Sequence, residues 1–162
     1  MDKPMHSATP GPVHDFLAEH TRLLRSSLRR LAGRDLLDPF VRDEEAADAL
    51  YHASFVVLSH DAATDPCFTY ANLTAQRLFE MNWAEIVGLP SRLSAEPLAR
   101  DERQRLLERV SRDGFIADYS GVRVARSGRR FRIQNATVWN LFDSDGSYRG
   151  QAACFNQWEP LD

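Results

Sequence analysis

Amide, hydroxyl and indole side chains alternate along one segment near the end of the chain, and such groups can hold a planar polar ligand. Strand side chains alternate between two faces, so Asn135, Thr137 and Trp139 should share the face of Phe131. An inward face would put an amide and a hydroxyl into an apolar cup, where a buried amide needs a hydrogen-bond partner. Asn156 on the next strand would add a second amide. We therefore predict a cradle for a heterocycle here, with amides satisfied by backbone or water as the alternative.

Histidines and acidic residues are the other side chains that could do chemistry. The histidines, which form no metal-binding motif such as HExxH, are His6, His14, His20, His52 and His60. His52 and His60 could ligate haem or sense pH, although a lone histidine is more often a capping or surface residue. The carboxylates fall at predicted helix starts, exposed faces and turns. With no nucleophile or phosphate-loop motif, the sequence predicts neither an enzyme nor a metal site.

The composition is that of an ordinary globular protein. The 162 residues are 43% hydrophobic and 27% charged, with a formal net charge of -3. A chain of this size can bury a self-sufficient core in one domain. No apolar run is long enough to span a membrane, and the first residues lack the apolar core of a secretion signal, so we expect a cytoplasmic protein. Cys67 and Cys154 do not suggest a disulfide framework, and the acidic balance gives no reason to expect a nucleic-acid partner.

Two helices are predicted before the first strand. Residues 1–11 carry few large apolar groups and should form a flexible N-terminus, followed by a helical segment over residues 12–53. The first helix has an apolar stripe at helical spacing, which something must cover. The stripe consists of Val13, Phe16, Leu17, Leu24, Leu28 and Leu31. Either the protein's own sheet or a second copy would bury it, so we expect a homodimer through this helix as one of two outcomes.

Residues 54–159 are predicted to form one α+β unit. Two β-branched and aromatic runs flank the turn-forming residues 61–66 and indicate an antiparallel hairpin. Asn72 and Asn82 then stand where each would cap a short helix.

A longer helix and three strands complete the predicted unit. The helix opens at residues 94–97 and places Leu106 and Val110 inward, while Arg103 and its charged neighbours face water. Strands joined by tight turns at Ser127-Gly128 and at DSDG follow as an antiparallel meander. The pattern therefore predicts an antiparallel sheet with short helices beside it.

The element order and several motifs resemble those of the PAS fold. Residues 68–72, FTYAN, end a predicted strand at the capping Asn72, and residues 83–88, WAEIVG, match the turn that follows in PAS domains. Over about residues 13–158 the sequence is similar to the bacterial MEKHLA domain family, which is PAS-like. The resemblance implies an α+β fold: a five-stranded antiparallel sheet with short helices on one face, preceded here by the two N-terminal helices.

The resemblance also bears on a ligand site. Residues 88–93 stand where flavin-binding light-oxygen-voltage domains carry a Gly-x-Asn-Cys-Arg-Phe motif, and Ser91 takes the position of the adduct-forming cysteine. A hydroxyl cannot act as the thiolate does, so covalent flavin chemistry is not expected even with a flavin bound. Arg92 could meet a phosphate or carboxylate, or pair with a surface acid. The matched stretches add Tyr70 and Phe79 to the predicted ligand-binding residues.

A PAS-like fold implies a sensory or regulatory module. A small molecule between the sheet and the short helices would bias contacts with a second copy or with a separate output protein. Two alternatives stay open, because fold alone does not fix function. One is a flavin- or haem-binding redox or photosensory protein without cysteine adducts, and the other is an interaction domain whose core is packed without a pocket.

Overall fold

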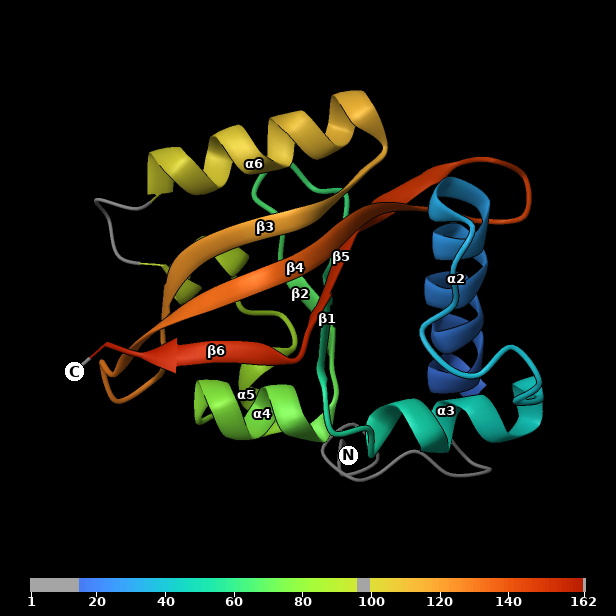
Figure 1. Cartoon of the computed structure of the whole chain (residues 1–162), viewed down its shortest axis with the longest axis horizontal. Helices are drawn as coiled ribbons and strands as arrows, with labels where there is room; N and C mark the ends of the chain where they lie inside the picture. Colours follow the sequence, from blue (N-terminus) through green and yellow to red (C-terminus); the bar gives the residue numbers. More distant parts are fainter. Residues whose placement is uncertain (1–14, 96–99, 162) are drawn as a thin grey trace.

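One antiparallel sheet carries helices on both of its faces (Figure 1). The computed structural model describes residues 15–95 and 100–161, so the predicted flexible N-terminus, residues 1–11, lies outside the described residues. As predicted, two helices precede the first strand: α2 (Asp15–Ala32) and α3 (Asp43–Tyr51). The later helices are α4 (Leu73–Phe79), α5 (Trp83–Ile86), the 3-10 helix η1 (Ser91–Ser94) and α6 (Arg100–Asp113).

The strands are arranged in the order β2-β1-β5-β4-β3, with β6 beside β4. Their bounds are β1 (Val56–His60), β2 (Phe68–Ala71), β3 (Phe115–Val124), β4 (Arg130–Phe142), β5 (Tyr148–Phe155) and β6 (Gln157–Pro160). The predicted hairpin of β1 and β2 is confirmed, and so is the antiparallel α+β architecture. The sheet has six strands and not the predicted five, because the last strand is interrupted at Asn156. Beyond that residue β6 continues along β4.

Both predicted asparagine caps are present. Asn72 Oδ1 accepts a hydrogen bond from the amide of Ala75 at 3.1 Å and so begins α4. Asn82 and Glu85 form a reciprocal capping box at the start of α5. Each cap begins a short helix, so the chain forms separate helical segments within a few residues of one another. The segments α4, α5 and η1 follow one another across one face of the sheet.

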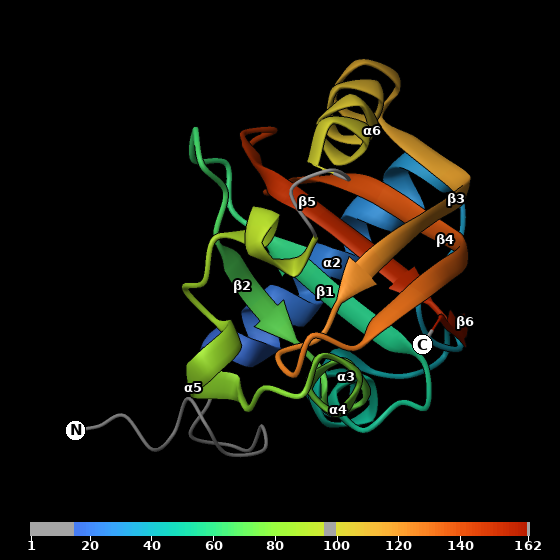
Figure 2. The ribbon, with the colours of Figure 1, turned by 90° about the vertical axis from the view of Figure 1, so that its left-hand side faces the viewer.

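Helix α2 lies against the opposite face of the sheet, behind the strands in the view of Figure 2. Leu17, Leu24 and Leu28 pack with Trp139 and other residues of the outer sheet face in one hydrophobic cluster. The Trp139 indole donates a hydrogen bond to the Leu24 carbonyl at 3.2 Å. The protein's own sheet therefore covers these leucines of the predicted stripe, and they are not left for a second copy to bury.

The predicted face assignment of β4 is wrong beyond Ile133. Asn135 has a φ of 52°, and the strand bulges there. An extra residue reverses which face the following side chains meet. Phe131 and Ile133 therefore share the cluster under α4 and α6 with Ala136 and Val138, and not with Trp139.

Candidate functional site

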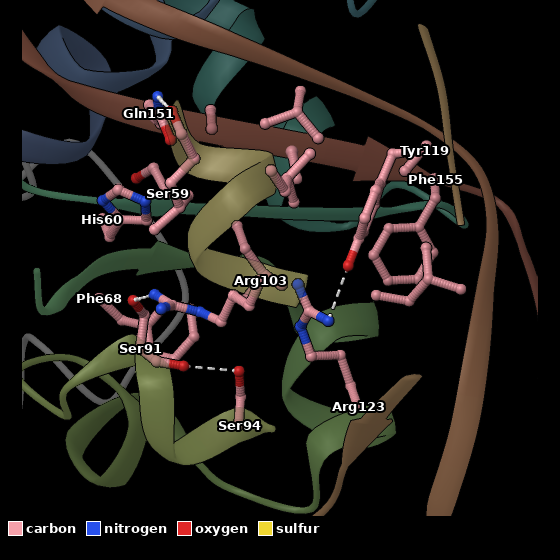
Figure 3. Close-up of a pocket in the computed structure, with 18 of the residues that line it drawn as sticks. Ser59, His60, Phe68, Ser91, Ser94, Arg103, Tyr119, Arg123, Gln151 and Phe155 are labelled. Carbon is pink, nitrogen blue, oxygen red and sulfur yellow. Dashed lines mark hydrogen bonds between the residues drawn. The ribbon is translucent and has the colours of Figure 1, made fainter. Parts of the chain in front are cut away.

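A cavity of about 70 Å³ lies between the sheet and the helices α4, η1 and α6 (Figure 3). Its wall is mostly apolar, with polar side chains entering from several surrounding elements. The apolar wall includes Leu58, Phe68, Phe79, Leu106, Ile133, Ala136, Val138, Ala153 and Phe155. The polar groups that enter it come from η1 (Ser91, Ser94), α6 (Arg103), β3 (Tyr119, Arg123) and the neighbouring ends of β1 and β5 (His60, Gln151). These groups decide what the cavity can bind.

Arg103 extends from α6 into the cavity and is buried, with only 6% of its surface exposed to solvent. One guanidinium nitrogen donates to Ser91 Oγ. Among the described residues no carboxylate oxygen lies within 4 Å of a nitrogen of this guanidinium. The nearby carboxylate of Asp65 pairs with Arg92 instead, at 3.1 Å. Burial, followed by the charge of Arg123, lowers the pKa of Arg103 to about 10. The cavity thus holds a buried positive charge that no described carboxylate neutralises.

A second arginine approaches the same cavity from β3. Arg123 Nη1 donates to the Tyr119 hydroxyl at 2.9 Å and to the Val122 carbonyl at 3.0 Å. The hydroxyl end of the Tyr119 ring lies against Gly121, where a Cβ would meet the tyrosine hydroxyl. Gly121 thereby allows Tyr119 to hold Arg123 beside the cavity (Figure 3).

Two buried polar atoms at the other end of the cavity have no partner within the described structure. They are Nε2 of His60 and Oε1 of Gln151. Burial lowers the pKa of His60, and the charge of Arg103 lowers it further. His60, Leu107 and Gln151 also line an outer cleft beside residues 61–66, so at this end only these side chains stand between the cavity and the cleft. Buried polar groups are normally hydrogen-bonded, which makes this a place for a ligand group or water.

The structure brings only two of the predicted ligand-binding residues to this cavity, Ser91 and Phe79. Trp139 is buried on the opposite face of the sheet, and so is Tyr70. Arg92 is exposed and pairs with Asp65, as the surface-acid alternative anticipated. The bulge in β4 is the reason that Trp139 turns away from the cavity.

The remaining predicted residues, Asn135, Thr137 and Asn156, line a shallow pocket on the α2 side of the sheet. There Arg34 donates to Thr137 Oγ1 at 2.6 Å. Asn135 is exposed and donates to Gln157 Oε1 at 3.1 Å, outside the cavity. These residues stay together as predicted, but they do not face the cup between the sheet and the short helices.

Sequence reasoning missed the residue that dominates the cavity. Arg103 was placed on the wet face of its helix, yet it precedes Leu106 by three positions and Val110 by seven. That spacing puts all three on one helical face, and all three are buried. The signal was therefore present in the pattern, and the charge of arginine obscured it.

A serine–histidine pair lies on the other side of β1. His20 Nε2 and Ser59 Oγ are 2.8 Å apart, and Ser59 Oγ is also 2.8 Å from Thr69 Oγ1. His20 and Ser59 are both buried, and burial lowers the pKa of His20 to about 4. The pair links α2 to the hairpin of β1 and β2, and Ser59 is also one of the residues that line the cavity.

A flavin or haem does not fit the cavity in this conformation. A cavity of 150 Å³ holds a molecule the size of benzene, and this one has about half that volume. Arg103 crosses the space to reach Ser91, and the amides predicted to meet a heterocycle lie elsewhere. We therefore derive no chemistry through either cofactor.

Two further features concern metal binding and membrane spanning. No group of three or more metal-ligating side chains is gathered in the described part of the chain. No helix in residues 15–95 or 100–161 is both long and apolar enough to cross a membrane.

Comparison with known proteins places this geometry in a family. The model of the MEKHLA domain matches residues 18–160, whereas no curated protein matches the chain. In structure the chain is similar to the PAS domain of a protein from Colwellia psychrerythraea, with a TM-score of 0.61 and 11% identity, over 73% of this chain and 95% of that one. It is also similar to a fungal LOV domain photoreceptor, with a TM-score of 0.53 and 19% identity over 84% and 90% of the two chains.

A third similar structure is a light-oxygen-voltage domain studied with a flavin analogue, with a TM-score of 0.52 and 18% identity over 72% of this chain and 84% of that one. At these identities the likeness shows the fold, which is that of PAS and LOV domains. The family match includes both N-terminal helices as well as the sheet. The chain therefore belongs to the MEKHLA domain family, with a PAS-like fold.

Proposed function

We propose that this protein is a sensory or regulatory module that binds a small molecule in the cavity between the sheet and α6. The observation that carries the proposal is Arg103, a buried charged side chain that faces the cavity and has no carboxylate partner among the described residues. A packed interaction domain would have no need to bury such a group, because a buried charge without a partner is strongly unfavourable.

The position of α6 suggests how binding would be transmitted. Arg103 and Leu106 belong to α6, and Gln151 on β5 bonds both the Leu107 carbonyl and Ser111 Oγ of that helix. A ligand held by Arg103 would therefore bias the position of α6 against the sheet. The signal would leave through contacts with a second copy or a separate output protein, and the module itself would catalyse no reaction. The two free cysteines suit the reducing cytoplasm.

A screen of small metabolites of positive, negative and zero charge tests the proposal. We expect at least one compound to raise the melting temperature and to shift the NMR signals of Ala153 and Leu106, which line the cavity. If no compound perturbs these signals, the cavity is not a binding site and the packed interaction domain becomes the better assignment. An absorption spectrum of the purified protein with bands of flavin or haem would instead favour the cofactor alternative.

A further inference from the structure

We infer that the ligand is a small organic carboxylate, whose carboxylate group pairs with Arg103 while its carbon chain lies along the apolar wall. The inference rests on the proposed function and names the ligand class for the same cavity. It follows from three features of the site: N–H donors of Arg103 that have no acceptor, a positive charge without a carboxylate partner, and an apolar cavity of small volume.

The donor capacity of Arg103 exceeds its contacts. A guanidinium has five N–H donors, and the hydrogen bond to Ser91 Oγ uses one of them. Arginine is planar and matches the two oxygens of a carboxylate in a bidentate pair. In Figure 3 the Arg103 side chain runs from α6 through the middle of the cavity lining, so its free donors are presented to the space inside.

The local charge is positive on both sides of the space. Arg123 lies close enough to lower the pKa of Arg103, and its own hydrogen bonds go to uncharged oxygens of Tyr119 and Val122. Asp65, the carboxylate whose charge raises the pKa of Arg103, is half exposed and already bonded to Arg92. An anion between the two guanidinium groups would relieve their repulsion and supply the missing partner.

The lining favours an organic acid over an inorganic anion. Phosphate or sulfate would need polar partners on every side, but the wall opposite the arginines is built from side chains such as Ile133, Val138 and Phe155. Burial of a short carbon chain against this wall is favourable, at roughly 0.8 kcal/mol for each buried methylene. The cavity volume of about 70 Å³ restricts the ligand to a short chain.

A route for entry lies at the end of the cavity farthest from Arg123. There His60, Leu107 and Gln151 separate the cavity from the outer cleft. The unpartnered Nε2 of His60 and Oε1 of Gln151 would meet polar groups of an entering ligand or its water. This end can admit a ligand without opening the sheet.

The test compares propionate with propionamide, its uncharged analogue, on the unmodified full-length protein. We expect propionate to raise the melting temperature and to shift the Arg103 Nε–H signal, while propionamide at the same concentration does neither. Acetate and inorganic phosphate complete the series, and benzoate serves as a carboxylate that is too large for a cavity of about 70 Å³. Binding of propionamide as tight as that of propionate, binding of phosphate without any carboxylate, or no binding by acetate or propionate would each overturn the inference.

Two variants on the same helix locate the charge. Arg103→Met should weaken propionate binding at least tenfold, and Arg105→Met, which removes an exposed arginine two positions away, should leave it unchanged. Arg103→Met should fold, because replacing a buried charge by an apolar side chain is often neutral or stabilising. Unchanged propionate binding in Arg103→Met would contradict the assignment.

The two proposals fail in different ways. If neutral or cationic compounds perturb the cavity signals and carboxylates do not, the sensory module stands and the carboxylate inference falls. If nothing perturbs those signals, both fall.

Discussion

Asn135 donates a hydrogen bond to Gln157 Oε1 at 3.1 Å, across the point where β4 exchanges β5 for β6 as its partner. On the other side of β4, Ala136 pairs with Tyr119 and Ile133 pairs with Gly121, so β4 advances three residues where β3 advances two. The positive φ of Asn135 absorbs the irregularity. This bulge decides that Ala136 and Val138 face the cavity while Thr137 and Trp139 face α2.

Substitution at Asn135 should therefore follow backbone preference. Asn135→Gly is expected to keep full stability, because glycine adopts the left-handed region freely, whereas Asn135→Val should lose about 1–2 kcal/mol. Arg132→Val is the matched control at an exposed position that pairs regularly with Val122 and Glu159, and we expect it to stay within about 0.5 kcal/mol. Urea unfolding measures all three. Equal stability of Asn135→Val and the control would show that the bulge is not strained.

The same bulge explains how far the sequence could predict the site. Alternation along β4 is a local rule, and it assigns Phe131 and Ile133 correctly to the inner cluster. The sequence Asn135-Ala136-Thr137 does not predict a bulge, because asparagine is also common in turns and at edge positions. The prediction therefore failed for every residue after Asn135, and the polar side chains expected in the cup were found on the other face.

Caps and turns were predicted well because their chemistry is local. Asn72 and Asn82 bond amides three residues ahead, so each signal lies within one turn of helix. Arg103 needed knowledge of what faces α6, and a charged residue in an amphipathic pattern is ordinarily assigned to water. The ion pairs of the β3–β4 turn, Arg126 with Glu85 and Arg129 with Glu80, likewise join segments that the sequence does not connect.

Asn72 should be among the least replaceable polar residues. Its side chain accepts from the amides of Val57 and Ala75 and donates to the carbonyls of Leu50 and Phe55, and it is fully buried. Asn72→Ala would remove all four of these hydrogen bonds, although the Leu50 carbonyl would keep the bond from the Ala53 amide at 3.2 Å, so we expect a loss of about 3 kcal/mol or more. Asn82→Ala removes only the exposed cap of α5 and should lose about 1 kcal/mol. Similar losses for the two variants, measured by urea unfolding, would contradict this view of Asn72.

The buried ion pair between Arg25 and Asp35 should stabilise the protein only as a pair. Arg25 is 1% exposed and bonds both oxygens of Asp35, at 2.9 and 3.1 Å, which fastens the segment after α2. Asp35→Leu should lose about 3 kcal/mol, because Arg25 would keep only the uncharged Val41 carbonyl at 3.1 Å and the half-exposed Asp43 at 3.4 Å. The double variant Arg25→Met/Asp35→Leu should recover part of that loss in thermal unfolding. A double variant that is less stable than Asp35→Leu would show that the charges themselves are needed.

The decrease of folding stability at acidic pH should depend on His20. Burial lowers the pKa of His20 to about 4 in the folded protein, while an unfolded histidine keeps a pKa near 6.5. Below pH 6.5 the unfolded state therefore binds more protons than the folded state, and folding stability falls as the pH decreases toward 4. A fall in the pKa of His20 from 6.5 to about 4 corresponds to a loss of folding stability of about 3 kcal/mol between these pH values.

His20→Gln should make the curve between pH 7 and pH 4 flatter, because the variant has no proton to take up at this position. The curve should not become level, since the pKa of His60 is also lowered by burial and acts in the same direction. His52→Gln, which changes an exposed histidine, is the matched control for the loss of an imidazole. Urea unfolding at a series of pH values measures the slopes, independently of any change in stability at pH 7. If His20→Gln keeps the full slope of the unmodified protein, His20 is not the buried neutral group that its contact with Ser59 at 2.8 Å implies.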